Sequence, residues 1–316
     1  MKSDNTAIEL EQQLHHAGFK GRVVSTNHLP ELESDFARLL ETGDLNKDFY
    51  DEIVSRYGLD WDFKPPSKLP TASSIIITAA QQPKISLEFH HDGESYYGII
   101  PPTYVYNTDA AVLKVISKYL DEHEYRVCDA RVPAKLLAVR SGLARYGRNN
   151  ITYIDGWGSY FRLRAYFSDA PCMEEHWQEW RAMELCNKCT ACVKKCPTSA
   201  IGEGRFLVDA GKCLTFFNEG EKGFPEWIDP TWHNCLIGCM ICQDVCPANK
   251  DHTSWLMPGA EFSDEETIMI LEGVSRDDLP AQTREKLQKV YMLDSYELLK
   301  RNLKVLIDRV KGSGIS

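Results

Sequence analysis

The chain reads CNKCTACVKKCP at residues 186–197 and CLIGCMICQDVCP at residues 235–247. Each run spaces four cysteines by two or three residues and closes with proline. Nine of the eleven cysteines lie between residues 186 and 246, so they are concentrated in one part of the chain. Cysteines grouped in this way, with no export signal in the sequence, are typical of metal ligands rather than disulfides.

The first run has the spacing of bacterial ferredoxins, in which three thiolates bind one [4Fe–4S] cluster and the fourth, before proline, binds the other. The second run repeats this spacing with one additional residue. Structural zinc also uses Cys-x2-Cys pairs, but it rarely needs four cysteines followed by proline, twice. The sequence therefore predicts two [4Fe–4S] clusters and a protein that carries electrons.

Two such clusters need eight thiolates, and nine cysteines are available in this region. The first cluster is expected to take Cys186, Cys189, Cys192 and Cys246. The second is expected to take Cys196, Cys239 and Cys242, with either Cys213 or Cys235 as its last ligand. The spacing leaves that choice open.

Composition and charge limit the partners and the cellular location that we expect for this protein. The net charge is −10, which disfavours polyanions for the molecule as a whole, although arginines crowd residues 126–164 and form a candidate anion site. No apolar run reaches the ~20 residues that a membrane span needs. With no apolar leader after Met1, we expect a cytoplasmic protein without a membrane partner.

Apolar patterning predicts the fold class as α+β. Residues 1–60 read as helical, residues 74–78 and 161–167 as strands, and residues 85–100 as a hairpin. We expect an N-terminal helical segment (1–64), a mixed α/β domain (65–175), a double-cluster ferredoxin-like domain (176–255) and a C-terminal helical segment (256–316).

Three further stretches resemble a known family. GLARYGRNNI at residues 142–151, FSDAP at residues 167–171 and the cysteine runs that follow are similar to the shared core of epoxyqueuosine reductases and corrinoid reductive dehalogenases. FLVDAGKC at residues 206–213 and Arg301-Asn302-Leu303 resemble later parts of the reductase. The resemblance favours Cys213 over Cys235 as the eighth ligand.

The resemblance implies a cobalamin, held base-off on the α/β domain. Electrons from a low-potential donor such as ferredoxin or flavodoxin would pass through the two clusters to this cofactor, which reduces a substrate. The substrate implied by the reductases is epoxyqueuosine in tRNA. A soluble dehalogenase-like reductase of small molecules and a non-catalytic two-cluster electron carrier are the alternatives.

The resemblance also implies site residues. Asp129 and Tyr146 are the candidate catalytic residues, as proton donors to the leaving oxygen. The candidate cofactor-binding residues are Gly142, Arg145, Gly147, Arg148, Asn149 and Asn150.

Overall fold

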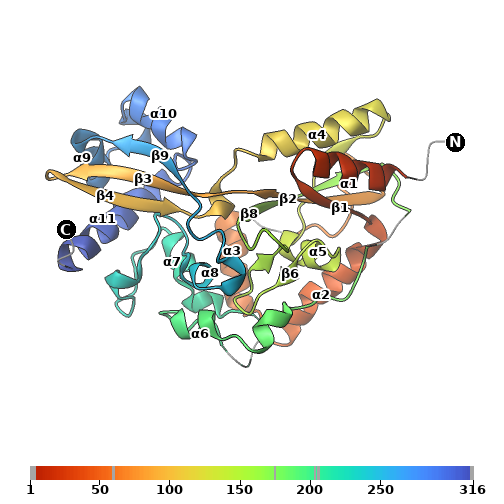
Figure 1. Ribbon diagram of the computed structural model, residues 1–316, viewed down its shortest axis with the longest axis horizontal. Helices are drawn as coiled ribbons and strands as arrows, with labels where there is room; N and C mark the ends of the chain where they lie inside the picture. Colours follow the sequence, from red (N-terminus) through yellow and green to blue (C-terminus); the bar gives the residue numbers. More distant parts are fainter. Residues whose placement is uncertain (1–4, 59–60, 174–175, 203, 205–206, 314–316) are drawn as a thin grey trace. The chain divides into compact units, whose positions relative to one another are not determined.

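The computed structural model describes residues 5–58, 61–173, 176–202, 204 and 207–313 (Figure 1). Its contacts group into two compact units. The first unit comprises residues 1–81, 107–189 and 204–207, and the second comprises residues 82–106, 190–203 and 208–316. The four-segment division expected from the sequence stays a prediction.

A four-stranded antiparallel sheet forms the centre of the first unit. Its strands, in spatial order, are β1 (Lys20–Ser25), β2 (Ser74–Gln81), β8 (Phe161–Ser168) and β5 (Val127–Asp129). β2 carries a run of isoleucines that is buried on both faces of the sheet, as a central strand requires. The sheet is therefore enclosed between two layers of helices.

Helices cover both faces of this sheet (Figure 1). α1 (Thr6–His16) and α4 (Asp109–Glu122) pack on one face. α2 (Leu29–Glu41) and α5 (Ala134–Arg140) pack on the other. α3 (Lys47–Tyr57) completes the N-terminal part. The alternation of side chains along each strand supplies both apolar faces.

The prediction that residues 1–60 are helical was wrong for β1. This strand pairs with β2 in antiparallel register, from Lys20 opposite Ala79 to Ser25 opposite Ser74. Its sequence, KGRVVS, is short and half polar, so its strand conformation comes from pairing with β2 rather than from local pattern.

The second unit has a smaller sheet, in the order β4 (Glu94–Ile100), β3 (Lys84–His91) and β9 (Leu256–Phe262). The predicted hairpin is confirmed, with Asp92 and Gly93 at positive φ in its turn. β9 joins β3 in parallel. α9 (Asp264–Glu272), α10 (Ala281–Lys289) and α11 (Tyr296–Ser313) bury their apolar faces in the same core.

Short helices carry the cysteine region of the second unit. They are α6 (Ala191–Lys195), α7 (Leu214–Asn218) and α8 (Ile241–Asp244). α6 contacts α8, so the two cysteine runs lie against each other here. In the part of the chain that the structure describes, no helix is long and apolar enough to span a bilayer.

Candidate functional site: a hairpin at the first cysteine run

A small hairpin holds most of the predicted cofactor-binding segment. β6 (Arg145–Tyr146) pairs with β7 (Thr152–Tyr153) in the first unit. The amide of Gly147 donates to the carbonyl of Ile151 at 2.8 Å, and Asn150 adopts φ +58° in the connecting turn. Asparagine tolerates this left-handed conformation better than most residues. The turn is thus held by a backbone hydrogen bond and has a conformation that its asparagine can adopt.

The hairpin contacts the segment that leads into the first cysteine run. Tyr146 accepts a backbone hydrogen bond from Met183 at 2.8 Å. The backbone amide of Arg148 lies 3.4 Å from Sγ of Cys186, and the Arg148 guanidinium donates to the Cys186 carbonyl at 2.5 Å. The segment that resembles the reductases therefore directly contacts the first predicted cluster ligand.

Two buried donors in this turn have no hydrogen-bond partner among the residues that the structure describes. They are Nε of Arg148 and Nδ2 of Asn150. An unpaired buried donor is costly, so such groups usually face a ligand or an ion that completes them. Cluster sulfides and the amide oxygens of a corrin are both acceptors, and the residues present fit either group.

The remaining predicted cofactor-binding residues have structural partners of their own. Nδ2 of Asn149 donates to the Tyr153 hydroxyl at 2.9 Å. A Cβ at Gly147 would lie 2.5 Å from the Tyr153 ring, so the side-chain packing requires glycine there. Gly142 follows α5 at φ +73°, where a helix commonly ends with glycine. Arg145 is exposed, and its guanidinium lies 3.6 Å from Asp155.

Tyr146 lines an apolar cavity of about 740 Å³ in the first unit. Other lining residues come from α2 (Asp35, Phe36 and Leu39), from α5 (Leu136) and from the segment before the first cysteine run (Trp180). The Tyr146 side chain is buried, and burial, followed by the charge of Asp35, raises the pKa of its phenol. The phenol therefore keeps its proton at neutral pH at the wall of this cavity.

Asp129 lies elsewhere in the first unit. Its side chain is 60% exposed, and its carboxylate accepts a hydrogen bond from Arg164 at 2.8 Å. Asp129 does not line the cavity of Tyr146. The structure thus does not bring the two candidate catalytic residues together around this cavity.

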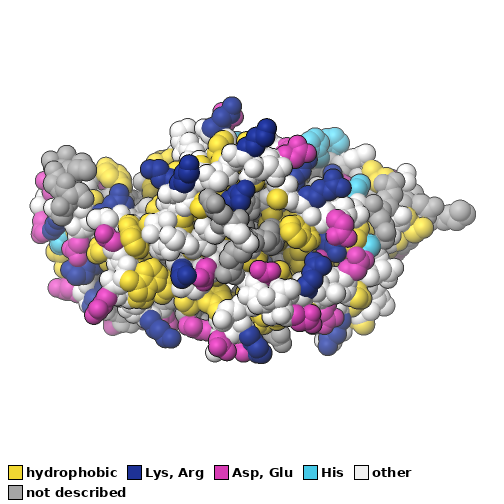
Figure 2. Space-filling view, turned by 90° about the horizontal axis from the view of Figure 1, so that it is seen from below, with side chains coloured by type: hydrophobic (Ala, Val, Ile, Leu, Met, Phe, Trp, Pro, Cys, Tyr) yellow, Lys and Arg dark blue, Asp and Glu magenta, His cyan; other side chains and the backbone are white. Residues whose placement is uncertain are grey.

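The arginines of residues 126–164 are largely paired with carboxylates. The ion pairs are Arg126–Asp169, Arg140–Asp35, Arg145–Asp155, Arg162–Asp109 and Arg164–Asp129. Figure 2 shows basic and acidic side chains interspersed on the face that it draws. The predicted cluster of arginines is real, but its charge is mostly compensated within the first unit.

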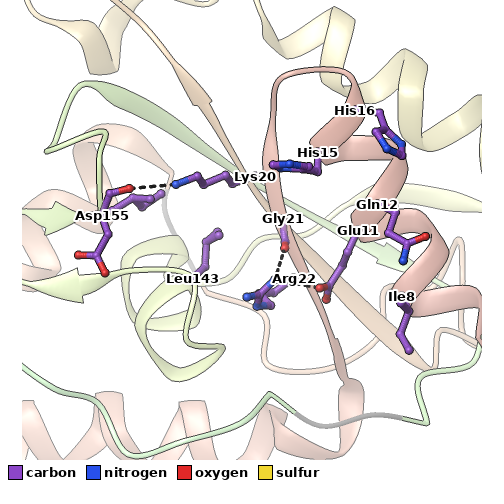
Figure 3. A pocket seen from close by; sticks show the side chains of 11 residues that line it. Ile8, Glu11, Gln12, His15, His16, Lys20, Gly21, Arg22, Leu143 and Asp155 are labelled. Carbon is purple, nitrogen blue, oxygen red and sulfur yellow. Dashed lines mark hydrogen bonds and ion pairs between the residues drawn. The ribbon is translucent and has the colours of Figure 1, made fainter.

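A second cavity, of about 460 Å³, lies beside α1 and β1 (Figure 3). Lys20 reaches across it to the Asp155 carbonyl at 3.0 Å, and Arg22 pairs with Glu11 at 2.9 Å. These basic groups already have partners in the chain. The predicted site residues do not line this cavity.

In the second unit, three predicted ligands of the second cluster influence one another's charge. Burial raises the pKa of Cys213, and hydrogen bonds from Thr215 oppose this. Burial, opposed by hydrogen bonds from Asn234 and Ile241 and assisted by the nearby thiols of Cys213 and Cys196, raises the pKa of Cys239 to about 11. Iron would displace these protons, because only thiolates bind it.

The described residues contain no group of three His, Cys, Asp or Glu side chains arranged for a single metal ion. The fit of the cysteines to clusters therefore rests on their spacing and their chemistry. Soft thiolates in this number and order suit iron–sulfur centres. Phe206, at the start of the reductase-like stretch before Cys213, lies outside the described residues.

Arg301 and Asn302 on α11 join the loops that carry the cysteines of the second unit. Nδ2 of Asn302 donates to the carbonyls of Asn218 (2.9 Å) and Leu236 (2.7 Å). Nη2 of Arg301 donates to the Phe217 carbonyl at 2.9 Å. These bonds connect the segment after Cys213 to the segment after Cys235.

Sequence reasoning missed the aromatic and acidic residues that α2 contributes to the cavity of Tyr146. Asp35 and Phe36 lie more than one hundred residues before Tyr146 in the chain. Their amphipathic pattern indicates a helix but not the cavity that the helix faces. No local signal in the sequence would have identified them.

Known proteins similar to this chain include a double-cluster domain family and several epoxyqueuosine reductases. Residues 185–249 match the model of a 4Fe-4S double cluster binding domain. An epoxyqueuosine reductase from Cyclobacterium marinum is 33% identical over 141 residues, which is 44% of each chain. The Escherichia coli K12 epoxyqueuosine reductase is 31% identical over 185 residues, 56% of this chain and 46% of that relative. The chain resembles the epoxyqueuosine reductases.

The resemblance predicted from the sequence motifs and the α+β fold class with its double-cluster segment are thus confirmed. The structure of epoxyqueuosine reductase from Streptococcus thermophilus superposes with a TM-score of 0.63 at 16% identity, covering 97% of this chain and 82% of that one. At this identity the likeness establishes a shared fold. The chain spans less than half the length of the curated relatives it matches.

Proposed function

We propose that the chain is an iron–sulfur oxidoreductase of the epoxyqueuosine reductase type, working in the reducing cytoplasm. The observation that carries this proposal is the contact of the reductase-like hairpin with the double-cluster segment, through the Arg148 amide and Sγ of Cys186. A simple electron carrier has no need of such a hairpin. The sequence similarity to epoxyqueuosine reductases supports the same proposal.

The proposed cluster ligands are Cys186, Cys189, Cys192, Cys196, Cys213, Cys239, Cys242 and Cys246. Electrons would enter from a low-potential protein donor of the ferredoxin or flavodoxin class. Hydrogen bonds to the cluster sulfurs would help to set the potentials at which these electrons move.

Cobalamin is the proposed second cofactor, and it would supply the reducing centre that acts on the substrate. The residues that fit it are Arg148 and Asn150, whose buried donors need acceptors, and the apolar wall that includes Tyr146. The protonated phenol of Tyr146 would donate to the leaving oxygen. Asp129 remains a second candidate for this role.

The proposed substrate is epoxyqueuosine in tRNA. One solved epoxyqueuosine reductase, whose fold resembles this chain with a TM-score of 0.60 at 18% identity, is in complex with an epoxyqueuosine-modified tRNA-Tyr stem loop. For this chain the substrate is an inference from the family resemblance. An RNA would need basic contacts other than the paired arginines of residues 126–164.

An anaerobic reconstitution tests the proposal. The full chain is loaded with iron, sulfide and cobalamin, excess cofactor is removed, and iron, corrin and EPR spectra are recorded. We expect about eight iron atoms and about one base-off corrin per chain. Reduction of an epoxyqueuosine-containing tRNA stem loop is then assayed beside the free nucleoside.

The outcomes separate the candidate functions. Iron without retained corrin would refute the reductase and leave an electron carrier. Corrin retained with turnover only of small molecules would refute the tRNA substrate. A Cys172→Ala variant, which removes a thiol outside the cysteine runs, controls for nonspecific effects of cysteine loss.

A further inference from the structure

Asn234 lies immediately before the second cysteine run and contacts one of its cysteines. Its Nδ2 is 3.2 Å from Sγ of Cys239 and 3.0 Å from the Trp232 carbonyl. Its Oδ1 accepts from the Met240 amide at 2.8 Å. The amide group therefore uses both of its N–H donors and its oxygen within one loop.

The orientation of this amide follows from its partners. The Met240 backbone N–H requires an acceptor, so the atom that faces it is the oxygen. The Trp232 carbonyl requires a donor, so the other atom is the nitrogen. A flipped amide would place like groups together on both sides. Asn234 thus directs an N–H, and not an oxygen, at Cys239.

Cys235 also contacts this amide. Its side chain is buried, and its Sγ lies 3.1 Å from Oδ1 of Asn234. A thiol can donate to that oxygen, whereas an iron-bound thiolate has no proton to donate and would be repelled by it. The surroundings of Cys235 therefore suit a thiol better than a cluster ligand.

The surroundings of Cys213 differ from those of Cys235. Its sulfur accepts hydrogen bonds from the backbone and side chain of Thr215, and it lies within electrostatic reach of Cys196. The Cys235 sulfur also receives a backbone hydrogen bond, from Met240, so the two candidates for the eighth ligand differ in the thiol hydrogen bond that Cys235 gives to Asn234.

We propose that Cys235 is a structural thiol that fixes the amide of Asn234, and that Asn234 is a positioning residue that tunes the potential of the second cluster through Cys239. The proposal rests on the proposed function only in taking Cys239 as a cluster ligand. It assigns a role to the ninth cysteine, for which two clusters have no place.

The expected effect has a definite sign. Reduction adds negative charge to a cluster and its thiolates. The N–H dipole of Asn234 stabilises this added charge, so it raises the reduction potential. A single hydrogen bond to a charged group is expected to change the ratio of reduced to oxidised cluster on the order of tenfold, or about 59 mV for one electron.

The test is an EPR-monitored redox titration of the iron-loaded full chain with dithionite, without corrin or RNA. Asn234→Leu is expected to shift one of the two potentials to a more negative value and to leave the other unchanged. Cys235→Ala is expected to keep about eight iron atoms and to shift the same potential in the same direction. Cys235→Ser, which keeps a donor, is expected to restore it.

The matched variants are Cys213→Ser, expected to lose about four iron atoms, and Cys172→Ala, expected to change nothing. Loss of iron in Cys235→Ser with retention in Cys213→Ser would overturn the proposal, as would unchanged potentials in Asn234→Leu. Should Asn234→Leu fail to assemble, the pair Cys235→Ala and Cys235→Ser decides alone. Because corrin and RNA are absent, failure of the catalytic proposal cannot produce these results.

Discussion

His233 is a buried imidazole placed beside positive charge. Its Nδ1 has no hydrogen-bond partner in the described part of the chain, and the centre of the Phe224 ring lies 4.3 Å from the centre of the imidazole. Burial, followed by the charges of Arg301 and Arg309, lowers the pKa of His233 to about 4. The ring is therefore neutral in the folded protein at any pH well above 4.

This lowered pKa predicts a loss of stability in acid. The unfolded His233, with a pKa near 6.5, binds a proton that the folded protein excludes between about pH 6.5 and pH 4. Stability should therefore fall across this window by roughly 2–3 kcal/mol in total. His233→Gln should flatten this dependence in urea denaturation, relative to the exposed control His16→Gln. Equal pH slopes in both variants would contradict the prediction.

Tyr146 permits a test of proton donation at the proposed site. Tyr146→Phe keeps the buried ring but removes the phenolic proton, so stability, iron and corrin content should be retained. Loss of a general acid typically lowers kcat by about 10²–10⁴-fold. Tyr97→Phe, at an exposed tyrosine, is the control. If Asp129→Asn rather than Tyr146→Phe lowers the rate, the carboxylate is the donor.

At the scale of secondary-structure elements, α11 is hydrogen-bonded to the cysteine loops of the second unit. One face of this helix is buried through Leu299, Leu303 and Ile307. Asn302 lies on that face and is almost fully buried, and it bonds two carbonyls outside the helix. A polar residue is tolerated there because its donors are satisfied.

Removal of the Asn302 amide should therefore loosen these loops. Asn302→Ala removes the donor to the buried Leu236 carbonyl and leaves the Asn218 carbonyl with the Arg301 guanidinium at 3.2 Å, at a cost of roughly 1–3 kcal/mol. We expect a lower urea midpoint and faster release of iron to a chelator. Lys304→Ala, on the exposed side of α11, should change stability by less than about 0.5 kcal/mol. Similar effects in the two variants would show that the Asn302 contacts contribute little.

For the molecule as a whole, charge is distributed so that the arginine-rich stretch is compensated. The ion pairs of Arg162 and Arg164 with Asp109 and Asp129 leave little net charge on that part of the first unit. Lys194 and Lys195 on α6 are exposed, and none of the described residues forms an ion pair with them. Unpaired cations contribute most to binding of a polyanion, because they release counterions.

RNA binding should accordingly respond to these lysines and not to the paired arginines. Lys194→Gln combined with Lys195→Gln should weaken binding of a tRNA stem loop and reduce the slope of log Kd against log salt by up to about 2. Arg164→Gln is the matched control, since its charge is already compensated. A larger effect of Arg164→Gln than of the lysine pair would contradict the prediction.

Much of the fold follows from local pattern. β2, the hairpin of β3 and β4, β8 and the C-terminal helices lie where apolar periodicity predicts them. β1 and β9 lie in segments predicted to be helical, and that prediction was wrong for them because each becomes a strand by pairing with a distant partner. β9 pairs with β3 across about 170 residues, and its own side chains are mostly exposed. The sequence of such a strand therefore has almost no apolar pattern from which a strand could be predicted.

The sequence alone was enough to recognise the cysteine runs and the segment at residues 142–151 as candidate site segments. Cluster ligation and tight turns depend on the spacing of neighbouring residues, which the sequence shows directly. Three features could not be recognised in the sequence. They are the contact of the Arg148 amide with Cys186, the cavity at Tyr146, and the hydrogen bond from the Asn234 amide to Cys239. These depend on where long-range packing places each backbone and on which way a hydrogen-bonding group then points. Spacing sets which atoms are available as ligands, and packing sets the hydrogen bonds that they receive.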